Sequence, residues 1–563
     1  MSSRLLCVLL LTASFSAQQA TPSPAVHSPA AAPVAQGFRM AGIVVNALSG
    51  QPVASASVAI APVSHGEERD ISRSFTTGSD GRFVFTGLPR GKYSMMAEAR
   101  GFSIQFFEHH DPYATAVAVG PDIESENLVF RLQPDASVAG DVTDENNEPI
   151  RFAQVRLFRR DTAEGRQRTY PINMAQTDDQ GHYHMGHLPP GTYYLAVSAR
   201  PWYAQNESTR PPKGSAYSEA DARAAQDAAA LDVTYPLTYY AGTTDSADAT
   251  ALQLAPGEKE TADVVLHASP ALHLRVHTGG ADSPVLGRMI FPRVSHRVFD
   301  DYVDSVANAP DSWVAPGVIE ISGLAPGHYI IEMPASVDDK GSARAWYREV
   351  DLAGDMDISA AEGPGFATVG GTILFEGLTR APKDASLALL NRETGESFRA
   401  DVSEKGEFSF PSDDIRPGRY LVQLDSPGGF FLRTITAAGA KIAGRTIEIT
   451  GSGNVRINGA ATTGLAQVNG TATRDGQPYS GAMIVLVPQD PANNVSLFRR
   501  DQSDSDGTFT LPQVVPGQYT VIAIANGWDL EWANPAVLQR YLKQGESVQV
   551  PAEGKLQVKV QVQ

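Results

Sequence analysis

Short runs in which apolar and polar residues alternate recur along the chain, and they predict β-strands with one buried face. In the first run, Phe83 and Phe85 alternate with Arg82 and Val84, which is the two-residue period of a strand. A polar residue and a glycine precede the run, and such a pair favours a hairpin turn. The same period recurs at four further pairs of apolar residues: Tyr183 and Met185, Ile319 and Ile321, Phe408 and Phe410, and Phe509 and Leu511.

Each alternating run leads into a second shared pattern, in which proline, glycine and tyrosine follow one another within about six residues, as in "LPRGKY" and "LPPGTY". Proline fixes φ, glycine permits a corner, and tyrosine opens the next strand. The pattern resembles the tyrosine corner of Greek-key sandwiches, so we expect each tyrosine hydroxyl to bond back to the backbone of its corner. The five corner tyrosines are Tyr93, Tyr193, Tyr329, Tyr420 and Tyr519.

The spacing of the corners predicts a tandem array. Successive corner glycines lie 100, 136, 91 and 99 residues apart, about one domain each. Many short strands with frequent turn signals are typical of sandwiches. We therefore predict an all-β chain, a tandem array of about five antiparallel Greek-key β-sandwich domains with two short helical insertions. The expected domains are residues 38–134, 135–268 (with a helical and Tyr-rich insertion), 269–361 (degenerate), 362–463 and 464–563.

The N-terminal residues predict export. An apolar run from Leu5 to Leu11 follows Arg4 and leads into small residues, which is typical of a signal peptide ending near Ala17. Residues 18–37 are rich in Ala and Pro and favour an extended leader. Cys7 is the single cysteine, so the mature chain would be cysteine-free, and no later run is long enough to span a membrane. The expected location is periplasmic or extracellular.

Composition narrows the class of partner. The formal net charge of −18 and the absence of a basic run argue against nucleic acid, because phosphate binding needs clustered Lys and Arg. No cofactor is expected.

These repeats resemble the carboxypeptidase regulatory-like family, which has transthyretin-like sandwiches and is named for the non-catalytic domain that follows some zinc carboxypeptidases. The resemblance covers almost the whole mature chain and is weakest in residues 270–360. It implies the fold, and it implies carbohydrate binding only because related sandwiches are grouped with carbohydrate-binding folds.

Histidines and acids offer three candidate metal sites. His65 and Glu68 have the spacing of zinc carboxypeptidase ligands, although they lie in an expected loop. His182 and His184 share one strand face and could bind a transition metal with His187, but exposed histidines of this kind are also typical of solvated surfaces. His109 and His110 form the third candidate, in a loop that also reads as an ordinary polar connection.

"DQSDSDG", from Asp501 to Gly507, resembles part of a calcium loop, but Gln513 stands where the bidentate acid should be, and a hairpin turn explains the segment as well. No nucleophile elbow, His-Glu-x-x-His motif or phosphate-binding loop occurs in the sequence.

Aromatic residues carry the binding hypothesis, because sugar rings stack on exposed Trp and Tyr. Trp202 lies nine residues after its corner tyrosine, where it could equally be a lid on the core. The helices are expected at residues 218–232 and after Asn534. The candidate ligand-binding residues are Trp202, Tyr203, Tyr235, Tyr239, Tyr240 and Trp532.

Three functions remain open at this point. The first is an exported, non-catalytic binding or scaffold protein that engages envelope or extracellular partners. The second is a carbohydrate-binding accessory of a polysaccharide-degrading system, for which polysaccharide is the partner. The third is a hydrolase without a recognisable motif.

Overall fold

The computed structural model describes residues 37–63, 72–110, 112–163, 165–206, 229–277, 291–299, 302–306, 311–315, 317–337, 343–359, 364–411 and 415–563. These residues fold into five successive β-sandwiches, each built from two facing sheets.

The first two sandwiches contain strands β1 to β18, with β19 at the junction to the third. The first consists of β1 (Phe38–Asn46), β2 (Ser57–Pro62), β3 (Arg73–Thr76), β4 (Arg82–Leu88), β5 (Gly91–Ala99), β6 (Phe102–Phe106), β7 (Val117–Val119) and β8 (Leu128–Leu132). The second consists of β9 (Ala136–Asp144), β10 (Gln154–Ala163), β11 (Arg166–Gln176), β12 (His182–Leu188), β13 (Gly191–Ser198), β14 (Val233–Thr234), β15 (Thr238–Tyr239), η1 (Ser246–Asp248), β16 (Leu252–Leu254), β17 (Lys259–Thr261), β18 (Val264–Leu266) and β19 (Ser269–Pro270).

The remaining three sandwiches follow in chain order. The third consists of β20 (Leu272–His277), β21 (Arg293–Phe299), β22 (Tyr302–Ser305), β23 (Asp311–Ala315), β24 (Val318–Leu324), β25 (Gly327–Val337), β26 (Ala343–Leu352) and β27 (Met356–Ser359). The fourth consists of β28 (Thr368–Phe375), β29 (Ser386–Asn391), β30 (Ser397–Asp401), β31 (Glu407–Ser409), β32 (Gly418–Asp425), η4 (Pro427–Gly429), β33 (Phe431–Ala438), β34 (Lys441–Ala443), β35 (Thr446–Ile449) and β36 (Asn454–Thr462). The fifth consists of β37 (Ala466–Arg474), β38 (Gln477–Pro478), β39 (Met483–Pro488), η5 (Val495–Leu497), β40 (Arg499–Gln502), β41 (Thr508–Val514), β42 (Gly517–Ile524), α2 (Pro535–Leu542), β43 (Glu546–Val550) and β44 (Lys555–Gln561).

One topology is used five times. The first strand of each sandwich pairs antiparallel with the strand before the corner, as β1 does with β4. It pairs parallel with a strand near the end of the sandwich, as β1 does with β8, β28 with β36 and β37 with β44. The second sheet contains the strand after the corner, for example β5 beside β2. The predicted all-β sandwich array is therefore confirmed, with a parallel strand pair in each sandwich that the alternation did not predict.

The alternating runs form the cores. Both apolar residues of every predicted pair are buried, from Phe83 and Phe85 in the first sandwich to Phe509 and Leu511 in the fifth. In the first and fifth sandwiches, a glycine of the first strand, Gly42 or Gly470, makes room for a phenylalanine of the run. At Gly470, a Cβ atom would lie 2.3 Å from Cζ of Phe509 and 2.6 Å from the carbonyl oxygen of Val558, so a side chain cannot fit there without movement.

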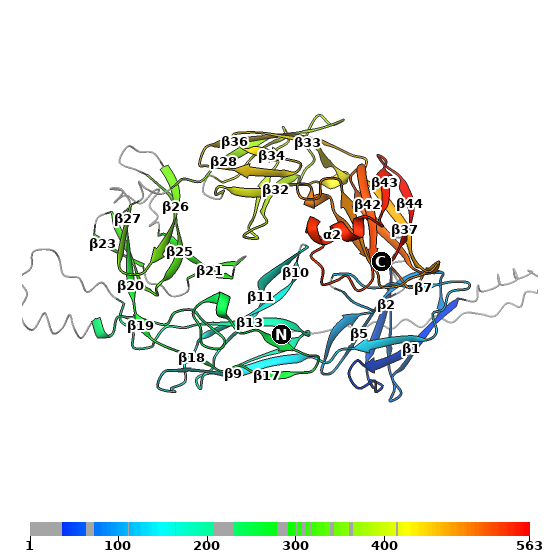
Figure 1. Ribbon diagram of the computed structural model, residues 1–563, viewed down its shortest axis with the longest axis horizontal. Helices are drawn as coiled ribbons and strands as arrows, with labels where there is room; N and C mark the ends of the chain where they lie inside the picture. The colour runs from blue at the N-terminus through cyan, green and yellow to red at the C-terminus, as the bar shows by residue number, and fades with distance from the viewer. Residues whose placement is uncertain are drawn as a thin grey trace, which may run out of the picture.

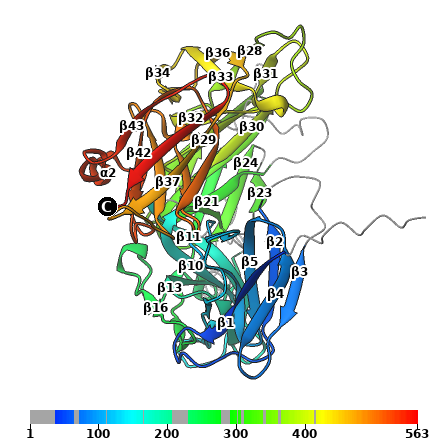
Figure 2. The same ribbon diagram turned by 90° about the vertical axis from the view of Figure 1, so that its right-hand side faces the viewer.

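The sandwiches follow one another around a ring, so that the fifth returns to the first (Figure 1). The view turned by 90° also shows the first sandwich, in blue, close to the strands of the fifth (Figure 2). Direct contacts support the closure: the backbone N–H of Ser505 donates to the carbonyl oxygen of Ala116 at 3.0 Å. The ring is therefore closed by hydrogen bonds between the first and fifth sandwiches.

The hairpin of β10 and β11 leaves the second sandwich and extends toward the middle of the ring (Figure 1). Near its tip, the carbonyl oxygen of Gly165 accepts from the N–H of Ala533 at 3.1 Å, and the N–H of Gln167 donates to Glu531 at 3.1 Å. Arg168 donates to the carbonyl oxygen of Arg392 in the fourth sandwich. One hairpin thus links three sandwiches.

Helix α2 follows the prediction for residues after Asn534. The Asn534 side chain accepts from the N–H of Ala536 at 3.1 Å, and Pro535 is the first helical residue. The other expected helix, residues 218–232, falls almost entirely outside the described residues, as do the signal peptide and most of the leader. In the part of the chain that the structure describes, no helix is long and apolar enough to cross a membrane.

Candidate functional site

The corner tyrosines form the same hydrogen bond in all five sandwiches. Each hydroxyl donates to the carbonyl oxygen four residues earlier, at distances from 2.5 to 3.0 Å. Burial raises the pKa of Tyr329 and of Tyr420 to about 12, because the charged phenolate would lose its hydration. The acceptors are Pro89, Pro189, Ala325, Arg416 and Val515.

The corner requires glycine for its lack of a side chain, rather than for the backbone freedom that the sequence suggested. The tyrosine ring folds back over it: Cε2 of Tyr420 would lie 3.4 Å from a Cβ atom at Gly418. The left-handed backbone position is four residues earlier, at Gly87 (φ 67°) and at His187 (φ 56°). At His187 this position coincides with an irregularity in the pairing of β9 and β12.

Trp202 is the most exposed of the aromatic candidates. It retains 82% of its accessible surface, so it is not the core lid that its position would allow. Its ring meets Tyr203 edge to face with the centroids 5.8 Å apart. Tyr203 is half-buried, and its hydroxyl is hydrogen-bonded to that of Tyr235.

The other aromatic candidates do not form an exposed groove with Trp202. Tyr235 and Tyr239 are buried, and Tyr240 is packed in part against the core of the second sandwich. Tyr239 is covered by the third sandwich: its hydroxyl donates to the carbonyl oxygen of Val298 at 2.5 Å. Trp532 is 9% exposed. The expectation that these rings line a sugar-binding groove was wrong for Tyr235 and Tyr239, because neighbouring segments cover their faces.

The histidine candidates are separated or paired with acids. His182, His184 and His187 are exposed on β12. His182 forms an ion pair with Asp141, which raises the pKa of this imidazole, while Nδ1 of His187 lies 2.7 Å from Asp135. Among the described residues, no group of three or more His, Cys, Asp and Glu side chains could hold a metal ion. His65 and Glu68 lie outside the described residues.

The remaining two candidates are the loop with His109 and His110 and the segment from Asp501 to Gly507, and they meet at the contact between the first and fifth sandwiches. The imidazole of His110 stacks on the ring of Trp528, with centroids 4.8 Å apart and planes 9° apart. Asp504, from the segment that resembles a calcium loop, accepts from the N–H of Ala116 at 2.9 Å. Lys92 Nζ lies 2.5 Å from Oδ2 of Asp504 and 3.6 Å from Oδ1 of Asp506. An ammonium group therefore occupies the position that a cation would take between these acids.

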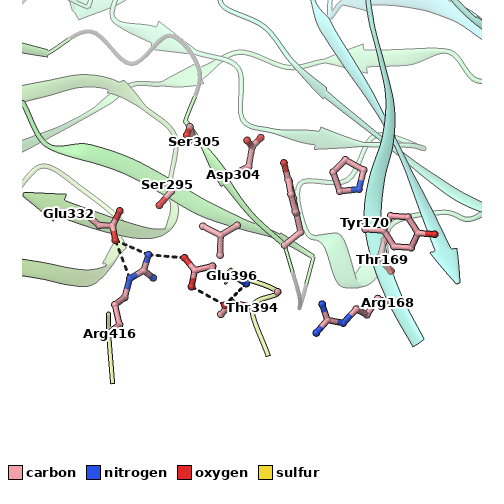
Figure 3. A pocket seen from close by; sticks show the side chains of 14 residues that line it. Arg168, Thr169, Tyr170, Ser295, Asp304, Ser305, Glu332, Thr394, Glu396 and Arg416 are labelled. Carbon is pink, nitrogen blue, oxygen red and sulfur yellow. Dashed lines mark hydrogen bonds and ion pairs between the residues drawn. The ribbon is translucent and has the colours of Figure 1, made fainter. Parts of the chain in front are cut away.

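A cavity of about 490 Å³ lies between the second, third and fourth sandwiches (Figure 3). Residues of β11 line one side, including Arg168 and Tyr170, and Arg416 lines the other. Arg416 donates to Glu332 of the third sandwich at 3.0 Å and lies 3.3 Å from Glu396 of the fourth.

The charges of this cavity are largely paired with one another. The Arg416 guanidinium also lies over the ring of Tyr347 at 5.8 Å, and Arg156 of the second sandwich forms an ion pair with Asp304 of the third. These contacts each join two sandwiches. The cavity is therefore a polar joint that fixes the angles between neighbouring sandwiches, with space for a small polar molecule.

Sequence reasoning missed this joint, because Glu332 and Arg416 are 84 residues apart and belong to no motif. One local signal existed. Arg416 occupies the corner position whose carbonyl accepts the tyrosine hydroxyl, where the other copies have Pro, Ala or Val. A charged residue at an otherwise apolar or cyclic position indicates a partner outside its own sandwich.

Comparison with known proteins finds a family match in the first two sandwiches. The carboxypeptidase regulatory-like domain matches residues 39–121 and residues 137–225. None of the curated proteins matches the sequence.

Solved structures match the chain at low sequence identity. The Bacillus anthracis TIE protein is 12% identical, with 90% of this chain and 68% of that chain covered, at a TM-score of 0.16. GBS52, the minor pilin of Streptococcus agalactiae, is 14% identical over 42% of this chain and 97% of its own, at a TM-score of 0.20. Scores this low carry no argument about function. Two stretches of the chain, one beginning in each of the first two sandwiches, are thus similar to the carboxypeptidase regulatory-like domain.

Proposed function

We propose that the chain is an exported, non-catalytic scaffold or binding protein whose five sandwiches hold one fixed arrangement. The observation that carries the proposal is the contact between the first and fifth sandwiches. A flexible string of domains would not bring specific side chains from its two ends together.

The chemistry of that contact supports a persistent arrangement. The side chain of Gln502 is 1% exposed, and its amide nitrogen donates to the carbonyl oxygen of Glu108 at 2.7 Å and to Thr115 Oγ1 at 2.8 Å. Buried amides need such partners, because an unsatisfied one costs about 1–3 kcal/mol. Separation of the two sandwiches would remove both acceptors from Gln502 at once.

Charge and sequence indicate the compartment and the partner. The signal-like residues 1–17 support export, and the net charge of −18 disfavours polyanionic partners. The two stretches that match the regulatory-like domain support a non-catalytic role. In the carboxypeptidases for which the family is named, this domain follows the catalytic domain and is itself non-catalytic. The partner class that fits is another envelope or extracellular protein.

Two measurements test the proposal. Expression with the native N-terminus, followed by cell fractionation and intact-mass analysis, should yield an exported protein cleaved near Ala17. Small-angle scattering of that protein should give a compact particle with the first and last sandwiches in contact. An uncleaved cytoplasmic protein would contradict export, and the scattering of five beads on an extended string would contradict the scaffold.

Trp202 favours a second candidate function, the carbohydrate-binding accessory. Its ring is 82% exposed and stands beside Tyr203, so one face is available to stack on a sugar. Electrophoresis through gels that contain soluble polysaccharides should show retardation that Trp202→Ala removes. Leu48→Ala is the matched control, because Leu48 is an apolar side chain with 61% exposure on a different sandwich. Equal mobility of the wild-type chain in all gels would exclude this function for the polysaccharides used.

A further inference from the structure

A second interdomain groove, of about 700 Å³, lies where the first, fourth and fifth sandwiches meet. Tyr113 of the first sandwich, Arg392 and Leu421 of the fourth, and Arg500 and Trp532 of the fifth are among its lining residues. The groove is complete only in the closed ring, so an inference about it rests on the proposed scaffold. Its volume is in the range of small-molecule sites.

Arg500 supplies a positive charge without a carboxylate partner. Its guanidinium lies 4.2 Å from the centre of the Trp532 ring and 5.0 Å from that of Tyr113. Burial lowers the pKa of Arg500, although an arginine in a protein remains charged. Within the described residues, this guanidinium forms no ion pair with an Asp or Glu side chain. Two aromatic rings and a hydroxyl are weak compensation for a buried cation.

Arg499 adds a second cation of the same kind. Its guanidinium donates to the backbone carbonyl oxygens of Phe498 at 2.7 Å and Gln513 at 2.9 Å. These neutral acceptors hold the side chain in place, and among the described residues no Asp or Glu side chain forms an ion pair with it.

Asp501 is the one acid among the lining residues of this groove. Its carboxylate accepts from the N–H groups of Thr510 at 2.7 Å and Gln502 at 2.9 Å, and burial raises its pKa to about 6. The guanidinium groups of Arg499 and Arg500 thus line the same groove as one carboxyl group, in a chain whose net charge is −18. Such a concentration of positive charge in an acidic protein indicates an anionic ligand.

Two buried polar atoms of residues that line the groove lack hydrogen-bond partners among the described residues. Trp532 Nε1 and Ser496 Oγ are shielded from solvent, and neither has a hydrogen-bond partner among the described residues. Both residues line the groove. Unsatisfied buried donors are uncommon in native proteins, so these two atoms mark the wall of the groove as incompletely paired.

We propose that this groove binds a small organic carboxylate with a ring-sized body. Arg500 is the principal cation for the carboxylate, and Leu390, Leu421 and Val495 are the apolar residues of the lining that the ring would contact. No covalent step is involved.

The test uses the mature full-length chain and two sugars that differ mainly in charge, D-galacturonate and D-galactose. Titration calorimetry and Trp fluorescence should show saturable binding of D-galacturonate only. Arg500→Gln should weaken that binding at least tenfold, because a charge-assisted hydrogen bond in a buried site contributes about 1.5–3 kcal/mol. Arg474→Gln is the matched control: Arg474 also lies over an aromatic ring, at 4.5 Å from the centre of Tyr479, but outside the groove. It should bind like the wild type.

Three results would overturn the carboxylate site: no saturable binding of D-galacturonate, equal binding of D-galactose, or full binding by Arg500→Gln. Scattering measured on the same samples separates the two proposals. A closed ring that does not bind D-galacturonate contradicts the site alone, whereas an open chain contradicts both the scaffold and the groove that depends on it.

Discussion

The ammonium nitrogen of Lys92 lies 2.5 Å from Oδ2 of Asp504, although 412 residues separate the two in the sequence. The pair is partly buried, with 30% of the Lys92 side chain and 16% of the Asp504 side chain exposed. Burial raises the pKa of Asp504, and the bond from Lys92 opposes that rise. This ion pair therefore connects the two ends of the ring, from β5 of the first sandwich to the turn before β41 of the fifth.

Removal of the Lys92 charge should loosen the ring. In Lys92→Ala, Asp504 and Asp506 would face each other without a cation. Because the pair is partly buried, this loss should cost more than the loss of an exposed ion pair, and the contact between the two sandwiches should be weakened by about 1–3 kcal/mol. Small-angle scattering should show a larger maximum dimension than the wild type, and salt should reduce the difference. Lys383→Ala, an exposed lysine of the fourth sandwich, should leave the profile unchanged. Superimposable profiles for Lys92→Ala and the wild type would show that the pair does not hold the ring closed.

Asp501 should make the fifth sandwich less stable as the pH rises. Its pKa of about 6 in the folded chain exceeds the value of about 3.9 in an unfolded one, so the folded state binds the proton more tightly. The associated stability is complete at low pH and is lost as the pH rises through about 6. At pH 7.5, Asp501→Asn should raise the free energy of unfolding by up to about 3 kcal/mol, and the melting temperature with it. At pH 4 the substitution should have little effect.

Differential scanning calorimetry from pH 4 to pH 7.5 measures this effect. Asp384→Asn removes an exposed carboxylate from the fourth sandwich and controls for net charge. If Asp501→Asn and Asp384→Asn give the same pH profile, the carboxyl group of Asp501 is not destabilised by burial.

The corner hydrogen bonds should contribute to stability one sandwich at a time. Tyr519→Phe keeps the ring and removes the bond to the carbonyl oxygen of Val515, which measures 2.8 Å. The expected cost is about 1 kcal/mol, confined to the fifth sandwich. Hydrogen exchange followed by mass spectrometry should show faster exchange in β41 and β42 and unchanged exchange in the first sandwich. Uniform acceleration throughout the chain would contradict a local role for the corner.

The glycine of the first strand should not tolerate a side chain. Gly470→Val would place a Cβ atom against Phe509 and the backbone of Val558, so the fifth sandwich should lose about 2 kcal/mol or more. Gly451→Ala is the control, since no atom lies within 4 Å of the added Cβ. Thermal unfolding monitored by Trp fluorescence compares the two, and a wild-type transition for Gly470→Val would show that the strands can separate to admit the side chain.

Local periodicity was enough to predict the sandwiches, because alternation such as Phe408 and Phe410 has one structural meaning wherever it recurs. It did not show the parallel pairing of β1 with β8, since this pairing depends on how the chain returns to its first strand and leaves no trace in the alternation of either strand. Nor did it place the left-handed residue of the corner, because His187 occupies there a position that glycine holds in the first copy.

The contacts between sandwiches were beyond sequence reasoning for a different reason. Tyr239 was expected in a groove and is instead covered by Val298, a residue of the next sandwich. Asp504 and Asp506 resembled cation ligands, and the cation is the side chain of a residue at the other end of the chain. Each segment was interpreted alone, whereas its surroundings are supplied by residues of another sandwich, 59 positions away for Tyr239 and 412 for Asp504.

The hairpin of β10 and β11 has a consequence for the order in which the protein can be assembled. Its partners Glu531 and Ala533 are synthesised more than 350 residues after the hairpin itself, so the second sandwich must complete its own fold with the tip of the hairpin still uncovered. Domains generally fold in the order of their synthesis. The last sandwich to emerge therefore converts a row of independently folded domains into a single body. A chain interrupted before residue 501 would keep four sandwiches and lose Asp504, Asp506 and Thr508, which contact the Lys92 ammonium group.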